Sequence, residues 1–267
     1  MAGDWFMGGF EQGRVTNDGS GGEFGNNRQS RFWLKVGSEA RIIFLDDFDW
    51  TVERGGHTMP LVPFCRYEYK LDLDGDWANC VYVTCTKTAG IPCKPADLGF
   101  RRMFVGAMTI LDVTPWKDRD TGEMRVTPRK KLLMAVPSAL SIIETKKERK
   151  GNLKGWLYTV ARHEKRSPRV GDDYEPMEKI DDLKAYLKQY GAENMNLDPY
   201  GFTAEEAEKF YRDLFAPMPI DEQQRLFSQY QITDGNGRRK SGGSSSGASA
   251  PKPEAGNPIS AADDIPF

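Results

Sequence analysis

The hydrophobic pattern of this chain changes once, near Pro176, and the change limits the folds that it can adopt. Before Pro176 the apolar residues form short runs rich in β-branched and aromatic side chains, with Gly and Asp between them, as is typical of β-strands. The Asp74-Gly75 pair has the residue types of a tight hairpin turn. The runs predict strands over residues 31–36, 41–45, 64–71, 80–84, 103–113, 131–136 and 156–162.

A single helix is predicted within this strand-rich part. Pro137 suits the first turn of a helix, residues 138–147 can continue it, and the glycines at 151 and 155 end it before the last strand. Six or so strands with one late helix predict a mainly β (α+β) fold, built on a small closed barrel of five to six strands.

Helical spacing replaces the strand pattern after Pro176. Apolar residues at helical spacing over residues 177–190 predict one helix. Thr203 and Glu206 have the capping-box spacing and predict the start of a second helix, and residues 220–230 predict a third. The sequence therefore predicts a C-terminal helical extension on the barrel.

Composition divides the chain into four segments. Residues 1–27 are rich in Gly and Asn and predict a mobile arm. Residues 28–170 form the strand-rich domain, and residues 171–234 form the helical extension. Residues 235–267 are built largely of Gly, Ser, Ala and Pro, so we expect a disordered linker and tip.

The net charge of −2 conceals a strong asymmetry. Residues 28–170 hold 26 Lys and Arg against 17 Asp and Glu, a net charge of +9. Residues 171–234 hold 6 against 15, a net charge of −9. A basic domain followed by an acidic one is what a polyanion binder with a shielding appendage would have, although two solvated surfaces can differ in charge by chance.

Aromatic and basic residues are interleaved throughout the strand-rich domain. Single-stranded nucleic acid requires this mixture, because bases stack on aromatic rings while phosphates need a track of cations. For any one aromatic residue, a place in the core is an equally good interpretation. The candidate DNA-binding residues are Arg31, Trp33, Lys35, Arg101, Arg102, Phe104, Trp116, Lys117, Lys130, Lys131, Trp156, Tyr158 and Arg162.

The last five residues form a compact docking tag of two carboxylates, an apolar pair and a terminal aromatic ring beside the α-carboxylate. Such a tag suits a partner pocket with an apolar floor and a border of Lys or Arg. The tag resembles the acidic tip of bacterial and phage single-stranded DNA-binding proteins, which ends in the same five residues. They are Asp263, Asp264, Ile265, Pro266 and Phe267.

Two internal stretches also resemble phage single-stranded DNA-binding proteins, namely residues 31–47 and residues 108–116 followed by residues 131–133. The resemblance implies an OB-type barrel and a protein that coats single-stranded DNA during replication, recombination or repair. It also implies that the tip recruits replication and recombination proteins. We expect the tip to compete with DNA for the basic groove, and self-association on DNA is compatible with this assignment.

The four cysteines lie within residues 65–93, which in a reducing compartment indicates metal ligands or buried thiols before disulfides. Some phage single-stranded DNA-binding proteins hold a structural zinc in a loop that ends in a CxxC pair, and the stretch around Cys93 has only the first Cys of such a pair. A zinc site and inert buried thiols therefore both stay open. The candidate ligands are His57, Cys85 and Cys93, with Cys65 or Cys80 as the fourth.

Two other functions compete with DNA binding. One is a protein–protein adaptor with incidental DNA affinity, and the other is a metal-dependent nuclease or recombination enzyme that uses Asp46, Asp47 and Asp49. Because the chain has no phosphate-binding Gly-Lys-Ser/Thr loop, nucleophile elbow or HExxH motif, we expect no enzymatic activity. No apolar run is long enough to span a bilayer and residues 1–10 do not resemble a signal peptide, so we expect no membrane partner and a cytoplasmic location, in the host bacterium for a phage protein.

Overall fold

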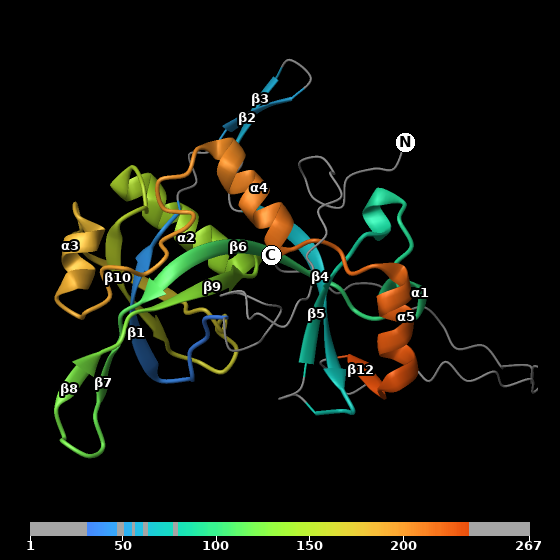
Figure 1. Cartoon of the computed structure of the whole chain (residues 1–267), viewed down its shortest axis with the longest axis horizontal. Coiled ribbons are helices and arrows are strands. Elements are labelled where there is room, and N and C mark those ends of the chain that lie inside the picture. Colours follow the sequence, from blue (N-terminus) through green and yellow to red (C-terminus); the bar gives the residue numbers. More distant parts are fainter. Residues whose placement is uncertain (1–30, 47–50, 55–56, 61–63, 77–79, 235–267) are drawn as a thin grey trace, which may run out of the picture.

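One large antiparallel sheet organises the molecule (Figure 1). The computed structural model describes residues 31–46, 51–54, 57–60, 64–76 and 80–234. The sheet contains β1 (Ser38–Phe44), β4 (Phe64–Leu73), β5 (Cys80–Thr84), β6 (Met103–Asp112), β9 (Arg129–Ala135), β10 (Trp156–Arg162), β11 (Asp173–Lys179) and β12 (Ile232–Asp234). Their order is β11-β10-β1-β6-β4-β12, with β5 paired to β4 and β9 paired to β6.

Two short hairpins and six helical segments complete the described part of the chain. The hairpins pair β2 (Thr51–Arg54) with β3 (His57–Pro60), and β7 (Pro115–Lys117) with β8 (Met124–Val126). The helical segments are η2 (Lys87–Ala89), α1 (Lys94–Asp97), α2 (Pro137–Lys150), α3 (Leu183–Lys188), α4 (Ala204–Leu214) and α5 (Ile220–Gln229).

The ten-residue strand β6 is the axis of the sheet. Along one edge it pairs first with β4, from Met103 to Ala107, and then with β1, from Ile110 to Asp112. Along its other edge it pairs with β9 over residues 106–112. Strand β6 therefore joins both halves of the sheet. At the usual rise of a strand, its ten residues place its two ends about 30 Å apart.

The predicted closed barrel is wrong, because the sheet is open: among the described residues its hydrogen-bonded ladders run from β11 to β12 and do not return. The predicted strand over residues 31–36 is also absent. Instead this segment crosses from β9 to the loop after β10. The amide of Phe32 donates one hydrogen bond to the carbonyl of Leu132, and the amide of Leu34 donates one to the carbonyl of Arg169, each 2.7 Å long. Closure would require a continuous ladder on this side of the core, and two isolated bonds do not form one.

The end of the strand-rich part is also different from the prediction. Residues 173–179 form β11 beside β10, so residues 177–179 lie in a strand where the start of a helix was expected. The helix that follows is only α3, with Asp182 accepting a hydrogen bond from the amide of Ala185 as its N-cap. Within β11, Pro176 lies opposite Tyr158, next to a bulge in the pairing. A proline is tolerated there because β11 is the last strand of the described sheet and needs hydrogen bonds on one side only.

Helices cover both faces of the sheet, and the alternation of side chains along each strand separates the cores. Helix α2 covers one face, helices α3 and α4 cover the other, and α1 and α5 cover the arm formed by β4 and β5 (Figure 1). Ile42 and Tyr158 belong to the α2 face, while their neighbours Ile43 and Leu157 belong to the α3 face. The capping box of α4, with Thr203 and Glu206, and the predicted third helix, found as α5, are confirmed.

Helix α4 is fixed to the sheet by a buried polar cluster. The carboxylate of Asp46 accepts two hydrogen bonds from the amide of Thr109, at 3.0 and 3.1 Å, and a third from the hydroxyl of Tyr211. That hydroxyl is also 2.7 Å from the hydroxyl of Thr109. All three residues are buried, so the cluster positions α4 over β6.

None of the described helices has the length and hydrophobicity that a bilayer-crossing helix needs.

Candidate nucleic-acid interface

One end of the sheet gathers several loops that are far apart in the sequence. Ser38, which opens β1, pairs with Arg162, which closes β10, and Asp112, which closes β6, pairs with Arg129, which opens β9. The segment 31–37, the loop 163–172 and the hairpin of β7 and β8 all leave the sheet at this end, toward the bottom of Figure 1. Loops held at one end of a rigid sheet are a common place for a binding site.

These loops carry a group of cations that we call the basic rim. Within the described part of the chain none of its members forms an ion pair, and all of them are exposed. The basic rim consists of Lys35, Lys117, Arg119, Arg129, Lys165, Arg166 and Arg169.

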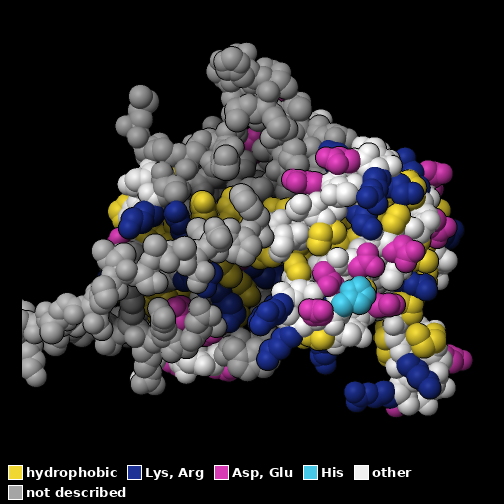
Figure 2. Space-filling model, turned by 180° about the vertical axis from the view of Figure 1, so that it is seen from behind, with side chains coloured by type: hydrophobic (Ala, Val, Ile, Leu, Met, Phe, Trp, Pro, Cys, Tyr) yellow, Lys and Arg dark blue, Asp and Glu magenta, His cyan; other side chains and the backbone are white. Residues whose placement is uncertain are grey.

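Two tryptophans project at the same end of the sheet. Trp33 lies on the segment that crosses from β9 to the loop 163–172 and is 48% exposed. Trp116 lies on β7 and is 43% exposed, and its indole nitrogen donates a 3.1 Å hydrogen bond to the hydroxyl of Thr127. In Figure 2 the projecting hairpin, at lower right, carries both hydrophobic and basic side chains. Exposed indoles beside unneutralised cations can stack bases while the cations hold phosphates.

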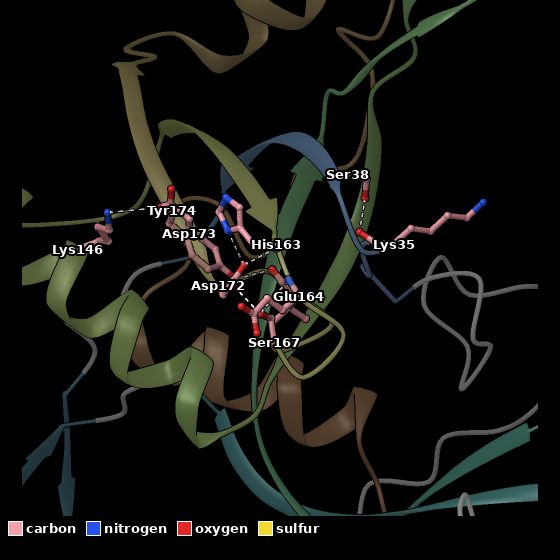
Figure 3. Close-up of polar contacts among 10 residues, drawn as sticks. Lys35, Ser38, Lys146, His163, Glu164, Ser167, Asp172, Asp173 and Tyr174 are labelled. Carbon is pink, nitrogen blue, oxygen red and sulfur yellow. Dashed lines mark hydrogen bonds and ion pairs between the residues drawn. The ribbon is translucent and has the colours of Figure 1, made fainter.

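The loop 163–172 is held in place by polar contacts (Figure 3). The Arg162 guanidinium donates to the carbonyls of Leu34, at 2.9 Å, and Lys165, at 3.0 Å. Asp172 accepts from the Ser167 hydroxyl at 2.5 Å and from the His163 amide at 3.0 Å. Desolvation raises the pKa of this carboxyl, but the hydrogen bonds outweigh desolvation and lower the pKa overall.

This Ser–Asp–His group does not have the geometry of a catalytic triad. The Ser167 hydroxyl and the His163 imidazole, whose Nδ1 is 3.2 Å from Asp172, both contact the carboxylate. In a triad the serine hydroxyl must form a hydrogen bond to the histidine that acts as its base. Here the Ser167 hydroxyl bonds the Asp172 carboxylate instead. The three residues therefore shape the loop that presents Lys165 and Arg166.

Several predicted DNA-binding residues have other roles in the structure. Arg31 forms hydrogen bonds of 2.7 and 3.0 Å to the buried carboxylate of Glu68 and lies over the ring of Tyr82. Lys131 forms a 2.8 Å ion pair with Asp112. These two cations are neutralised within the protein, so they are poor candidates for phosphate contacts.

Three further predictions do not fit the geometry. Tyr158 is fully buried in the core, where it packs edge-on against Phe44 at 5.5 Å, and Lys130 is also buried. A base cannot stack on Tyr158 unless the core opens. Trp156 is half-buried at the opposite end of β10 from Arg162 and packs against the core. Burial therefore argues against a DNA contact by Tyr158 and Lys130, and the position of Trp156 does not support one.

The remaining predicted residues, Arg101, Arg102 and Phe104, lie at the start of β6, about 30 Å from Asp112 at its other end. Arg102 lies over the ring of Tyr67 at 4.1 Å, and Phe104 packs edge-on against the same ring at 5.3 Å. The predicted set is thus divided between the two ends of β6. Sequence reasoning left out Lys165, Arg166 and Arg169, although with Arg162 they place four cations within eight residues directly after a strand.

Two of the described cysteines, Cys85 and Cys93, lie in one buried cluster, without a complete set of metal ligands among the described residues. Cys80, Cys85 and Cys93 are free and buried, and the Tyr69 hydroxyl is 3.4 Å from the Cys85 sulfur. A hydrogen bond from Cys93 is the largest influence that lowers the pKa of Cys85. No three potential ligands come together among the described residues, while the side chains of His57 and Cys65 lie outside them. Cys85 and Cys93 are therefore neighbours, and the proposed zinc stays a prediction.

The nuclease alternative loses one of its three carboxylates. Asp46 lies beneath α4 with its oxygens already bonded to Thr109 and Tyr211, so it faces the interior and not an open site. Asp47 and Asp49 lie outside the described residues, as do the predicted arm, linker and tip.

Comparison of the chain with models of protein families and with curated proteins finds no match.

Proposed function

We propose that this chain binds single-stranded DNA, with phosphates on the basic rim and bases on Trp33 and Trp116. The observation that carries the proposal is that two exposed indoles lie at the end of the sheet where seven cations lack a carboxylate partner among the described residues. A base stacked on an aromatic ring contributes about 1–3 kcal/mol. A single strand suits this surface better than a duplex because only a single strand offers free base faces.

The biological role that fits such binding is to cover single strands during replication, recombination or repair, without chemical change to the DNA. The acidic tip of residues 263–267 would then recruit partner enzymes, and its resemblance to single-stranded DNA-binding proteins supports this part of the proposal.

The proposal is tested by the affinity of the full-length protein for a labelled oligothymidylate, measured by fluorescence anisotropy. Replacing Trp33 or Trp116 by Ala removes one stacking contact of about 1–3 kcal/mol, which weakens binding by about 5-fold to about 150-fold. Quenching of tryptophan emission should accompany binding in the unmodified protein. Trp156→Phe is the matched control, because this indole lies at the other end of β10 and should not change the affinity.

Equal affinities for the Trp33→Ala, Trp116→Ala and unmodified proteins would show that the indoles do not contact DNA. A protein that binds no oligothymidylate at all would contradict the proposed function itself.

A further inference from the structure

A pocket lies at the end of β6 that is remote from the basic rim. It occupies about 340 Å³ between η2, α1 and the residues that lead into β6. Pockets that hold small ligands begin at about this volume. It is lined by Tyr69, Lys87, Ala96, Phe100 and Arg102.

One side of the pocket is cationic. Lys87 and Arg102 are exposed, and neither forms an ion pair in the described part of the chain. Arg102 is stacked on Tyr67 at 4.1 Å, which fixes the plane of its guanidinium. A guanidinium held in this way can present its edge to a phosphate with little further loss of conformational entropy.

The floor of the pocket is aromatic and uncharged. Phe100 packs edge-on against Phe227 of α5, with 5.7 Å between ring centroids, so its position is fixed. The Tyr69 hydroxyl contacts the Cys85 sulfur at 3.4 Å, and burial is the main cause that raises the pKa of Tyr69. Because that hydroxyl stays protonated, Tyr69 itself brings no negative charge to the floor, and the Cys85 thiol, whose pKa is lowered to about 5, lies behind it.

A pocket with two cations on one wall and two fixed rings at its floor suits an anion joined to an apolar ring. We propose that it holds one nucleotide of a bound single strand, with the phosphate against Lys87 and Arg102 and the base or sugar at the mouth of the pocket, above the largely buried rings of Phe100 and Tyr69. This inference rests on the proposed function, because it makes the pocket a second contact for a strand that already lies on the basic rim. Only a strand long enough to cover the roughly 30 Å length of β6 reaches both places.

The length of the oligonucleotide therefore provides the test. Full-length protein is titrated with oligothymidylates of about 4 and about 20 nucleotides, within and beyond the usual range of site sizes, at several salt concentrations. Each phosphate held by a cation contributes about 0.7 to the slope of log affinity against log salt for a single strand. The double variant Lys87→Gln, Arg102→Gln should lower this slope by about 1.4 for the long oligonucleotide and leave the short one unchanged.

Two controls make the result specific. Arg101→Gln removes a neighbouring exposed cation that does not line the pocket, so it should leave the slope for the long oligonucleotide unchanged. The variant Lys87→Gln, Arg102→Lys keeps the positive charge at position 102. It should therefore recover about half of the slope that the variant Lys87→Gln, Arg102→Gln loses. Thermal unfolding of each variant shows whether the fold is intact.

The outcomes separate this inference from the function on which it rests. Binding of both oligonucleotides with an unchanged slope in the double variant would show that the pocket holds no phosphate, and the proposed function would stand. An equal loss of slope for the short oligonucleotide would place the pocket within the primary site and refute a second contact. If neither the short nor the long oligonucleotide binds, both proposals are overturned. Competition by thymidine monophosphate, but not by inorganic phosphate, is expected if the rings contribute.

Discussion

The contact between Tyr211 and Asp46 allows a quantitative test of how the acidic helices join the sheet. Tyr211 is fully buried, and its hydroxyl bonds both the Asp46 carboxylate and the Thr109 hydroxyl. A hydrogen bond to a charged group contributes about 1.5–3 kcal/mol, and a buried acceptor that loses its donor costs a similar amount. Tyr211→Phe keeps the ring and deletes only the hydroxyl, so we expect a loss of about 2–3 kcal/mol in the free energy of unfolding.

The assay is thermal unfolding followed by circular dichroism. For a domain of this size, 1 kcal/mol shifts Tm by about 2–4 °C, so Tyr211→Phe should lower Tm by about 4–12 °C. Tyr230→Phe is the matched control, because Tyr230 is 38% exposed and its substitution should change stability by less than about 0.5 kcal/mol. The double variant Asp46→Asn, Tyr211→Phe should be less destabilised than the sum of the two single variants, since both remove the same contact.

A Tyr211→Phe protein as stable as the control would refute the argument that this hydroxyl fixes α4 to the sheet. The nuclease alternative would instead be supported if the protein cleaved DNA and the Asp46→Asn variant lost this activity without losing stability.

Two further predictions concern charge. Glu68→Gln should destabilise the protein by about 3–5 kcal/mol at pH 7, because it leaves two guanidiniums beside a buried site without their carboxylate. Burial raises the pKa of Glu68, but the neighbouring guanidiniums lower it below 4.5 overall, so its contribution is present above about pH 4.5 and is lost as the pH falls through the lowered pKa. Urea unfolding at pH 7 and below pH 4 should therefore show a smaller difference from the unmodified protein at the lower pH, and a constant difference would contradict the assignment. Separately, Lys165→Gln, Arg166→Gln should reduce the salt slope of DNA binding by about 1.4, whereas Lys184→Gln, Lys188→Gln on α3 should leave it unchanged, and equal slopes for the two double variants would argue against the basic rim.

Local patterns in the sequence were sufficient for much of the secondary structure. The runs around β1, β4, β5, β6, β9 and β10 are confirmed as strands, because their β-branched and aromatic residues favour an extended backbone wherever they pack. Pro137 at the start of α2 and the capping box of α4 are confirmed for the same local reason. The failures were the helix expected from residue 177, where β11 runs to Lys179, the strand expected over residues 31–36, and the closed barrel, which depends on pairing between distant strands.

The candidate site shows the same division. The sequence by itself determined that residues 28–170 are basic and rich in aromatics, and that Trp33, Lys35, Trp116 and Lys117 are polyanion-binding residue types. Only the tertiary structure decided which cations remain unneutralised. Arg31 meets Glu68, 37 residues away, and such a partner cannot be inferred from spacing along the chain. Likewise the alternation of faces across paired strands buries Tyr158, because a residue's neighbours across a sheet are set by register and not by its own chemistry.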